Sequence, residues 1–92
     1  MHIDEYQNLS TRIKRYKEGQ EDLYLLAKLT EETGEVAKEI RRKIDGESLQ
    51  KDLTLELGDL LWCISSIAER NGIKMSTIVE SNLTKLSERG LL

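Results

Sequence analysis

Apolar residues recur at intervals of three and four along most of this chain, and that spacing restricts the fold more than any other feature. The period is that of one face of an α-helix, whereas a half-buried strand would alternate apolar and polar residues. The 92 residues include no proline and only six glycines, and they are rich in Leu, Glu, Lys, Ile and Arg. Such a composition is typical of long helices. We therefore expect an all-α fold in a single domain that spans residues 1–92.

Breaks in the apolar spacing predict four helices. They run over about 3–17, over about 21–45, from just after Ser48 to near Asn71, and over about 76–89. Glycine lies close to each predicted end, where it often closes a helix. Thr77 and Glu80 have the spacing of a capping box at the start of the last helix. The short connection at Asp45-Gly46 predicts that the second and third helices form an antiparallel hairpin, the basis of a bundle of three to four helices.

The apolar stripes predict which helix faces are buried. For the second helix the stripe consists of Leu26, Leu29, Thr33, Val36, Ala37, Ile40 and Ile44. For the third helix it consists of Leu53, Leu57, Leu60, Leu61, Ile64, Ile67 and Ala68, with Leu55 and Trp62 on the opposite side. A helix with two apolar sides packs against two partners, and a chain this short has a thin core. We therefore expect a homo-oligomer.

Charge and residue usage argue against several classes of function. The formal net charge of -3 and the pI near 5.2 disfavour binding to a nucleic-acid polymer. The single histidine, His2, lies at the N-terminus, so a histidine-based zinc site or a catalytic triad is not expected. The most apolar stretch, 60–68, is far shorter than the roughly 20 residues that cross a bilayer. The single cysteine and the absence of a signal-peptide pattern predict a cytoplasmic protein.

Carboxylates remain as the groups able to do chemistry. Glu32 and Glu35 are three residues apart, as are Glu56 and Asp59, so each pair shares a helix surface. In an antiparallel hairpin that turns at Asp45-Gly46, Glu32 lies level with Asp59, and Glu35 with Glu56. The four carboxylates would repel one another unless a cation bound between them. An all-oxygen site of this kind suits Mg²⁺, with Mn²⁺ as the alternative.

Acidic pairs at this spacing are also common on solvated helix faces, since 17 of the 92 residues are acidic. Helical-wheel placement separates the two interpretations, because Glu32 and Glu56 each border an apolar stripe. The solvated-face interpretation fits Glu31, Glu39 and Asp52 better.

Two segments, LTEETGEVAKEI and LELGDLLWCISSIA, resemble the MazG-like nucleotide pyrophosphohydrolases of the all-α NTP pyrophosphatase group. The family pattern is E-x-x-E, a spacer and E-x-x-D, which this chain matches with Glu32, Glu35, Glu56 and Asp59 around a spacer of 20 residues. The resemblance covers about residues 23–89. It implies that these acids hold Mg²⁺ and form the catalytic site of a nucleoside triphosphate pyrophosphohydrolase. The products would be a nucleoside monophosphate and pyrophosphate, and the assembly a dimer or a dimer of dimers.

The resemblance also implies residues that bind the substrate's phosphates. Family members often end in a segment like N-x-x-K-x-x-x-R, which Asn82, Lys85 and Arg89 match. The alternative is that these three are ordinary polar residues at a helix end. Lys38 either reaches a phosphate or pairs with Glu35, three residues before it.

Three further residues, Glu31, Trp62 and Cys63, lie next to these carboxylates in the sequence or on the same helix. In the family manner Glu31 would activate the attacking water, although helical geometry turns it about 100° from Glu32. Trp62 either stacks on a nucleobase or belongs to an interface, and Cys63 is expected to be inert packing. The chain has no long insertion to shape a base pocket, so the sequence leaves base selectivity open.

The leading hypothesis is thus a magnesium-dependent pyrophosphohydrolase of NTPs or dNTPs that cleans the nucleotide pool. A rival hypothesis is a non-catalytic helical module that binds a nucleotide or a protein and regulates. A di-iron carboxylate bundle is disfavoured because such sites use E-x-x-H motifs, which this chain lacks.

Overall fold

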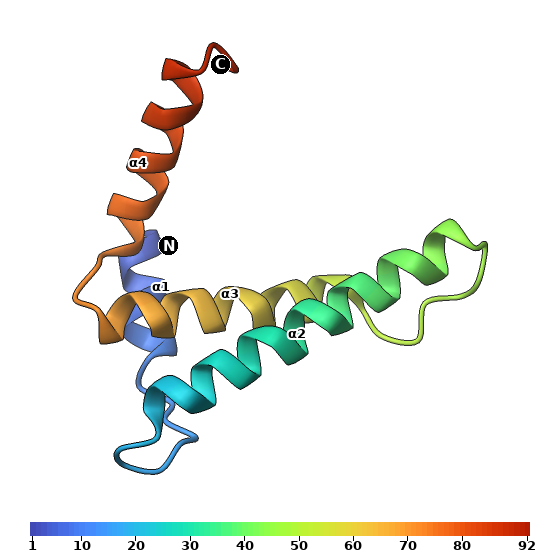
Figure 1. Cartoon of the computed structure of the whole chain (residues 1–92), viewed down its shortest axis with the longest axis horizontal. Coiled ribbons are helices and arrows are strands. Elements are labelled where there is room, and N and C mark those ends of the chain that lie inside the picture. The colour runs from blue at the N-terminus through green and yellow to red at the C-terminus, as the bar shows by residue number, and fades with distance from the viewer. The chain divides into compact units, whose positions relative to one another are not determined.

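The computed structural model describes residues 1–92 and is entirely helical outside its turns and connections (Figure 1). Its four helices are α1 (Ile3–Ser10), α2 (Glu21–Ile44), α3 (Leu53–Arg70) and α4 (Met75–Glu88). No helix has the length and apolar character needed to cross a membrane. The predicted all-α class is confirmed. The helices form two compact units, one of Met1–Lys14 with Ser65–Leu92 and the other of Arg15–Ile64, so that α3 contributes to both.

In the second unit, α2 and the first part of α3 form the predicted antiparallel hairpin (Figure 1). α2 ends in a Schellman motif: the N–H of Glu47 donates to the carbonyl of Arg42 at 2.8 Å, and the N–H of Gly46 donates to that of Lys43 at 3.2 Å. Gly46 has a φ of 75°, a conformation that glycine adopts without a Cβ clash. The predicted helix end at Asp45-Gly46 is therefore confirmed.

The buried face of α2 differs from the prediction. Leu26, Ile40 and Ile44 of the predicted stripe are 62%, 44% and 78% exposed. The buried residues of α2 are Leu25, Glu32, Val36 and Glu39. Apolar residues lie on more than one side of this helix, and the side that packs is the one that carries two carboxylates. The prediction was right for Val36, which is buried, but it was wrong for Glu39, because it placed that carboxylate on a solvated face.

Glu39 is the clearest correction, because it is only 1% exposed and not on a solvated face. Its carboxylate accepts a hydrogen bond from the backbone N–H of Gln50 at 3.1 Å. The Nε atom of Arg42 lies 3.7 Å from the same carboxylate. A buried charge is tolerated only with such partners, so these contacts explain how Glu39 can lie inside. Glu31 and Asp52 are exposed, as expected.

α1 is shorter than predicted, ending at Ser10 and not near residue 17. The hydroxyls of Ser10 and Thr11 donate to the carbonyl of Gln7 at 3.4 and 2.6 Å. Such side-chain bonds compete with the continuation of a helix. Tyr16, which lies within the predicted but outside the observed helix, packs against Tyr24 with ring centroids 5.7 Å apart.

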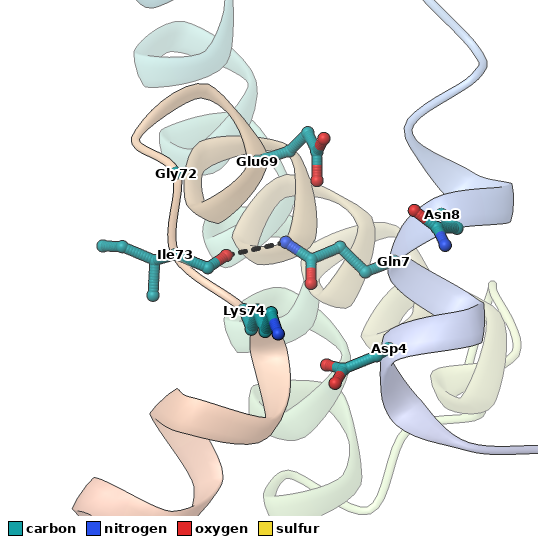
Figure 2. Close-up of a pocket in the computed structure, with 7 residues that line it drawn as sticks. All are labelled: Asp4, Gln7, Asn8, Glu69, Gly72, Ile73 and Lys74. Carbon is teal, nitrogen blue, oxygen red and sulfur yellow. Dashed lines mark hydrogen bonds between the residues drawn. The ribbon is translucent and has the colours of Figure 1, made fainter.

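In the first unit, side chains of α1 satisfy backbone groups at the start of α4 (Figure 2). Buried Gln7 donates from Nε2 to the carbonyl of Ile73 at 2.8 Å and accepts from the N–H of Met75 at 2.9 Å. Asp4 accepts from the N–H and the hydroxyl of Ser76 at 2.9 and 2.7 Å. α1 thereby caps N–H groups that a helix start leaves without partners.

The predicted capping box of Thr77 and Glu80 is wrong. α4 begins at Met75 with Lys74 as its N-cap residue, and Lys74 makes no side-chain cap hydrogen bond. The distant residues Asp4 and Gln7 serve as caps instead, and no local sequence pattern indicates them.

Candidate metal centre

The α2–α3 hairpin brings three carboxylates together, from Glu32 on α2 and from Glu56 and Asp59 on α3. One oxygen of each lies within 4.8 Å of the others. Glu32 and Glu56 are 6% and 7% exposed, whereas Asp59 is open to solvent. Glu56 and Asp59 are one helical turn apart, and Glu32 belongs to the buried side of α2. We refer to Glu32, Glu56 and Asp59 as the carboxylate cluster.

The carboxylate cluster has the chemistry of a divalent-cation site. Its donors are all oxygen, as Mg²⁺, Ca²⁺ and Mn²⁺ prefer. Oxygens bound to one cation at about 2.0 to 2.6 Å are separated by at most about twice that distance, so a spacing within 4.8 Å is close to what one ion needs. The exposed position of Asp59 leaves the cluster accessible to a ligand from solvent.

Glu35, the fourth predicted ligand, is not a member of the cluster. Its Oε2 atom lies 3.0 Å from the Nζ atom of Lys51, in the connection between α2 and α3. The hydrogen bond from Lys51 lowers the pKa of the Glu35 carboxyl, and the same bond raises the pKa of Lys51. Glu35 is therefore neutralised by a residue of the chain itself. Lys38, the partner that the sequence suggested, is exposed.

A second lysine neutralises Glu32. The Nζ atom of Lys28 lies 3.1 Å from Glu32 and 3.6 Å from Glu31. The hydrogen bond to Glu32 raises the pKa of Lys28. The four-residue spacing of Lys28 and Glu32 is visible in the sequence, so this pair could have been found there. Lys51 had no such signal, because it belongs to an irregular connection.

The third acid, Glu56, has a carboxyl whose pKa is raised, mainly because it is buried. The charges of Asp59, Glu32 and Glu35 act in the same direction. Lys51 opposes them without reversing the shift. A bound dication would relieve this repulsion, since an opposite charge nearby favours the ionised carboxylate.

The remaining predicted residues lie as follows. Cys63 is buried, and burial is the main cause that raises the pKa of its thiol, which agrees with inert packing. Trp62 is partly buried, and Glu31 has a side chain that is 61% exposed. Asn82 and Lys85 lie on α4, and Arg89 is its C-cap residue. These three are exposed residues of the first unit, whereas the carboxylates belong to the second.

Comparison with known proteins identifies the family of this chain. The family model described as the MazG nucleotide pyrophosphohydrolase domain matches residues 20–90, which include all of α2, α3 and α4. The chain is also 35% identical over 101 aligned positions to the "Gene 37 protein" of Mycobacterium phage L5. That alignment covers 97% of this chain and 89% of the phage protein. No solved structure matches.

Proposed function

This chain belongs to the MazG nucleotide pyrophosphohydrolase family, and from that premise we propose that it hydrolyses a nucleoside or deoxynucleoside triphosphate with the help of Mg²⁺. The bond broken would lie between the α and β phosphates, so that water adds to give a nucleoside monophosphate and pyrophosphate. The observation that carries the proposal is the carboxylate cluster on the α2–α3 hairpin. We propose that one domain, residues 1–92, holds the whole activity.

The chain's own residues fit the metal that this reaction requires. Glu32, Glu56 and Asp59 would hold the ion, and Glu35 stands one turn from Glu32 as a further ligand. Bound Mg²⁺ or Mn²⁺ would offset phosphate charge and lower the pKa of a water molecule. The acids lie on the helices α2 and α3, and regular elements hold metal ligands better than loops do.

Cationic and amide side chains would hold the phosphates. We propose this role for Asn82, Lys85 and Arg89, in line with the family-like C-terminal pattern, and for Lys38. Lysine and arginine form charge-assisted hydrogen bonds with phosphate oxygens. We further propose that the reaction clears unwanted nucleotides from the pool. Its substrates would be free nucleotides and not a nucleic-acid polymer.

Exposed apolar side chains support assembly into a dimer or a dimer of dimers. On α3, Leu57, Leu61 and Ile64 are 48%, 38% and 39% exposed and follow one another at helical spacing. Leu26 and Ile40 of α2 are also exposed. Exposed apolar side chains that recur on one face of a helix are typical of an interface between chains.

The test is a Mg²⁺-dependent hydrolysis screen over canonical and damaged nucleotides, with pyrophosphate and monophosphate both quantified. We expect both products from at least one nucleotide and none without metal. Asp59→Asn should lower turnover at least about 100-fold, since even the loss of a group behind a ligand costs 10- to 100-fold. Glu80→Gln, the same kind of charge loss on exposed α4, is the matched control.

Unchanged turnover in Asp59→Asn would overturn the site assignment. Nucleotide binding without release of pyrophosphate from any substrate would support the non-catalytic regulatory module instead. Circular dichroism must show the same helix content for each variant, so that loss of fold is not read as loss of chemistry.

A further inference from the structure

Lys51 is the feature of the metal centre that neither the carboxylate pattern nor the helix periodicity requires. It lies in the connection between α2 and α3, and its Nζ atom stands 3.0 Å from Glu35. Its charge also acts on Glu56, where it opposes the effect of burial. The side chain is 53% exposed, so its ammonium group is free to leave without breaking a packed core.

A hydrogen bond to a buried carboxylate positions the backbone just before Lys51. The carboxylate of Glu39 holds the backbone N–H of Gln50 at 3.1 Å, and Gln50 directly precedes Lys51. Glu39 is 1% exposed and has Arg42 beside it at 3.7 Å. The chain thus fixes the backbone of this connection while leaving the end of the lysine side chain in solvent. The lysine side chain is long and flexible and ends in a point charge, so its ammonium group can move between two anionic partners.

We propose that Lys51 is a built-in cation of the metal centre, which neutralises Glu35 until the phosphates of a nucleotide draw it away. In the chain without nucleotide, a metal ion would then meet only Glu32, Glu56 and Asp59. Glu35 would join the ligands once Lys51 had moved to the phosphates. This inference rests on the proposed function and adds to it a coupling between metal and nucleotide.

The coupling follows from charge. Lys51 and a dication repel each other. Lys51 therefore weakens the binding of the dication to the carboxylates, and the dication weakens the pairing of Lys51 with Glu35. A triphosphate that binds Lys51 removes this repulsion and strengthens metal binding. By linkage, metal must strengthen nucleotide binding by the same factor.

The experiment is a Mg²⁺ titration by calorimetry, first without nucleotide, on the full chain and three variants. Lys51→Met should bind Mg²⁺ about fivefold more tightly than the wild type. The interaction energy of an exposed ion pair corresponds to a change in affinity of up to about that size. Lys51→Arg keeps the charge and should bind Mg²⁺ as the wild type does. Lys43→Met removes the same charge from the exposed last turn of α2 and is the matched control, also with wild-type affinity.

The titration is then repeated with a non-hydrolysable nucleoside triphosphate analogue. The gain in Mg²⁺ affinity that the analogue produces should be about fivefold smaller in Lys51→Met than in the wild type. If the wild type bound no Mg²⁺ either with or without the analogue, the proposed function would be refuted, and this inference would be refuted with it. Wild-type Mg²⁺ binding that Lys51→Met leaves unchanged or weakens would overturn the role of Lys51 alone. Equal tightening in Lys43→Met would show a net-charge effect and overturn it as well.

Discussion

Replacing the buried glutamate Glu39 with glutamine tests the anchor that holds the connection between α2 and α3. The carboxylate accepts from Gln50 at 3.1 Å and lies 3.7 Å from Arg42. Glutamine has nearly the same shape, and its amide oxygen can still accept from Gln50. What the substitution removes is the negative charge, and what it adds is an N–H₂ group that has to find a partner in a buried place.

The magnitude follows from these contacts. A hydrogen bond to a charged group stabilises by roughly 1.5 to 3 kcal/mol, against about 1 kcal/mol for a neutral one. Arg42, whose side chain is 15% exposed, also forms an ion pair with Glu47 at 3.5 Å, so its charge still has a partner when Glu39 is neutral. We therefore expect Glu39→Gln to lower the free energy of unfolding by about 1.5 kcal/mol. For a chain of this size, that corresponds to roughly 6 to 12 °C in Tm.

The assay is thermal unfolding followed by circular dichroism, at one protein concentration because assembly would couple to stability. Glu31→Gln is the control: it is the same substitution on the same helix, at a side chain that is 61% exposed, and should change stability by less than about 0.5 kcal/mol. Hydrogen exchange of the Gln50 amide should become faster in Glu39→Gln. If Glu39→Gln matched the control in both measurements, the anchoring role of Glu39 would be refuted.

Two further predictions concern the helices. Hydrogen bonds from Ser76 hold the pKa of Asp4 below its usual 3.8, so its carboxylate stabilises the fold above that pH, and the contribution is lost as the pH falls through the lowered pKa. Asp4→Asn should thus unfold at a lower temperature than the wild type at pH 7, with the difference narrowing towards pH 2; a difference independent of pH would contradict this. Gly58 lies within α3, and a Cβ there would meet nothing within 4 Å, so Gly58→Ala should stabilise the isolated chain by roughly 0.5 to 1 kcal/mol in urea unfolding. Destabilisation that grows with protein concentration would instead indicate a second chain packed on that face.

Helix positions were predictable because apolar periodicity and glycine act locally. Gly46 and Gly72 both have positive φ, and both follow a helix end that their sequence neighbourhood predicts. The end of α1 was not predictable in this way, because hydroxyl groups of Ser10 and Thr11 stop it within an apolar stripe that continues. Its true length depends on a competition between side-chain and backbone bonds, which periodicity does not register.

The buried face of α2 was wrong for a different reason. A carboxylate is expected in water unless a partner is known, and the hydrogen-bond donor to Glu39, the N–H of Gln50, belongs to a connection eleven residues further along. The same limit applies to the site. Spacing and the hairpin turn correctly predicted that Glu32 lies near Asp59 and Glu56. Glu35 instead pairs with Lys51, whose position depends on that irregular connection.

The charges around the carboxylate cluster connect stability with the proposed function. The four acidic residues that the sequence singled out are accompanied by two paired lysines, Lys28 and Lys51, which leaves two negative charges in excess. That excess equals the charge of one dication. The carboxyl of Glu56 has a raised pKa even with Lys51 nearby, and burial is the main cause. A hairpin selected for stability alone would replace Glu56 with an apolar residue, since a buried like-charge cluster opposes folding at neutral pH. Its presence is understandable if the repulsion is what gives an incoming cation its affinity.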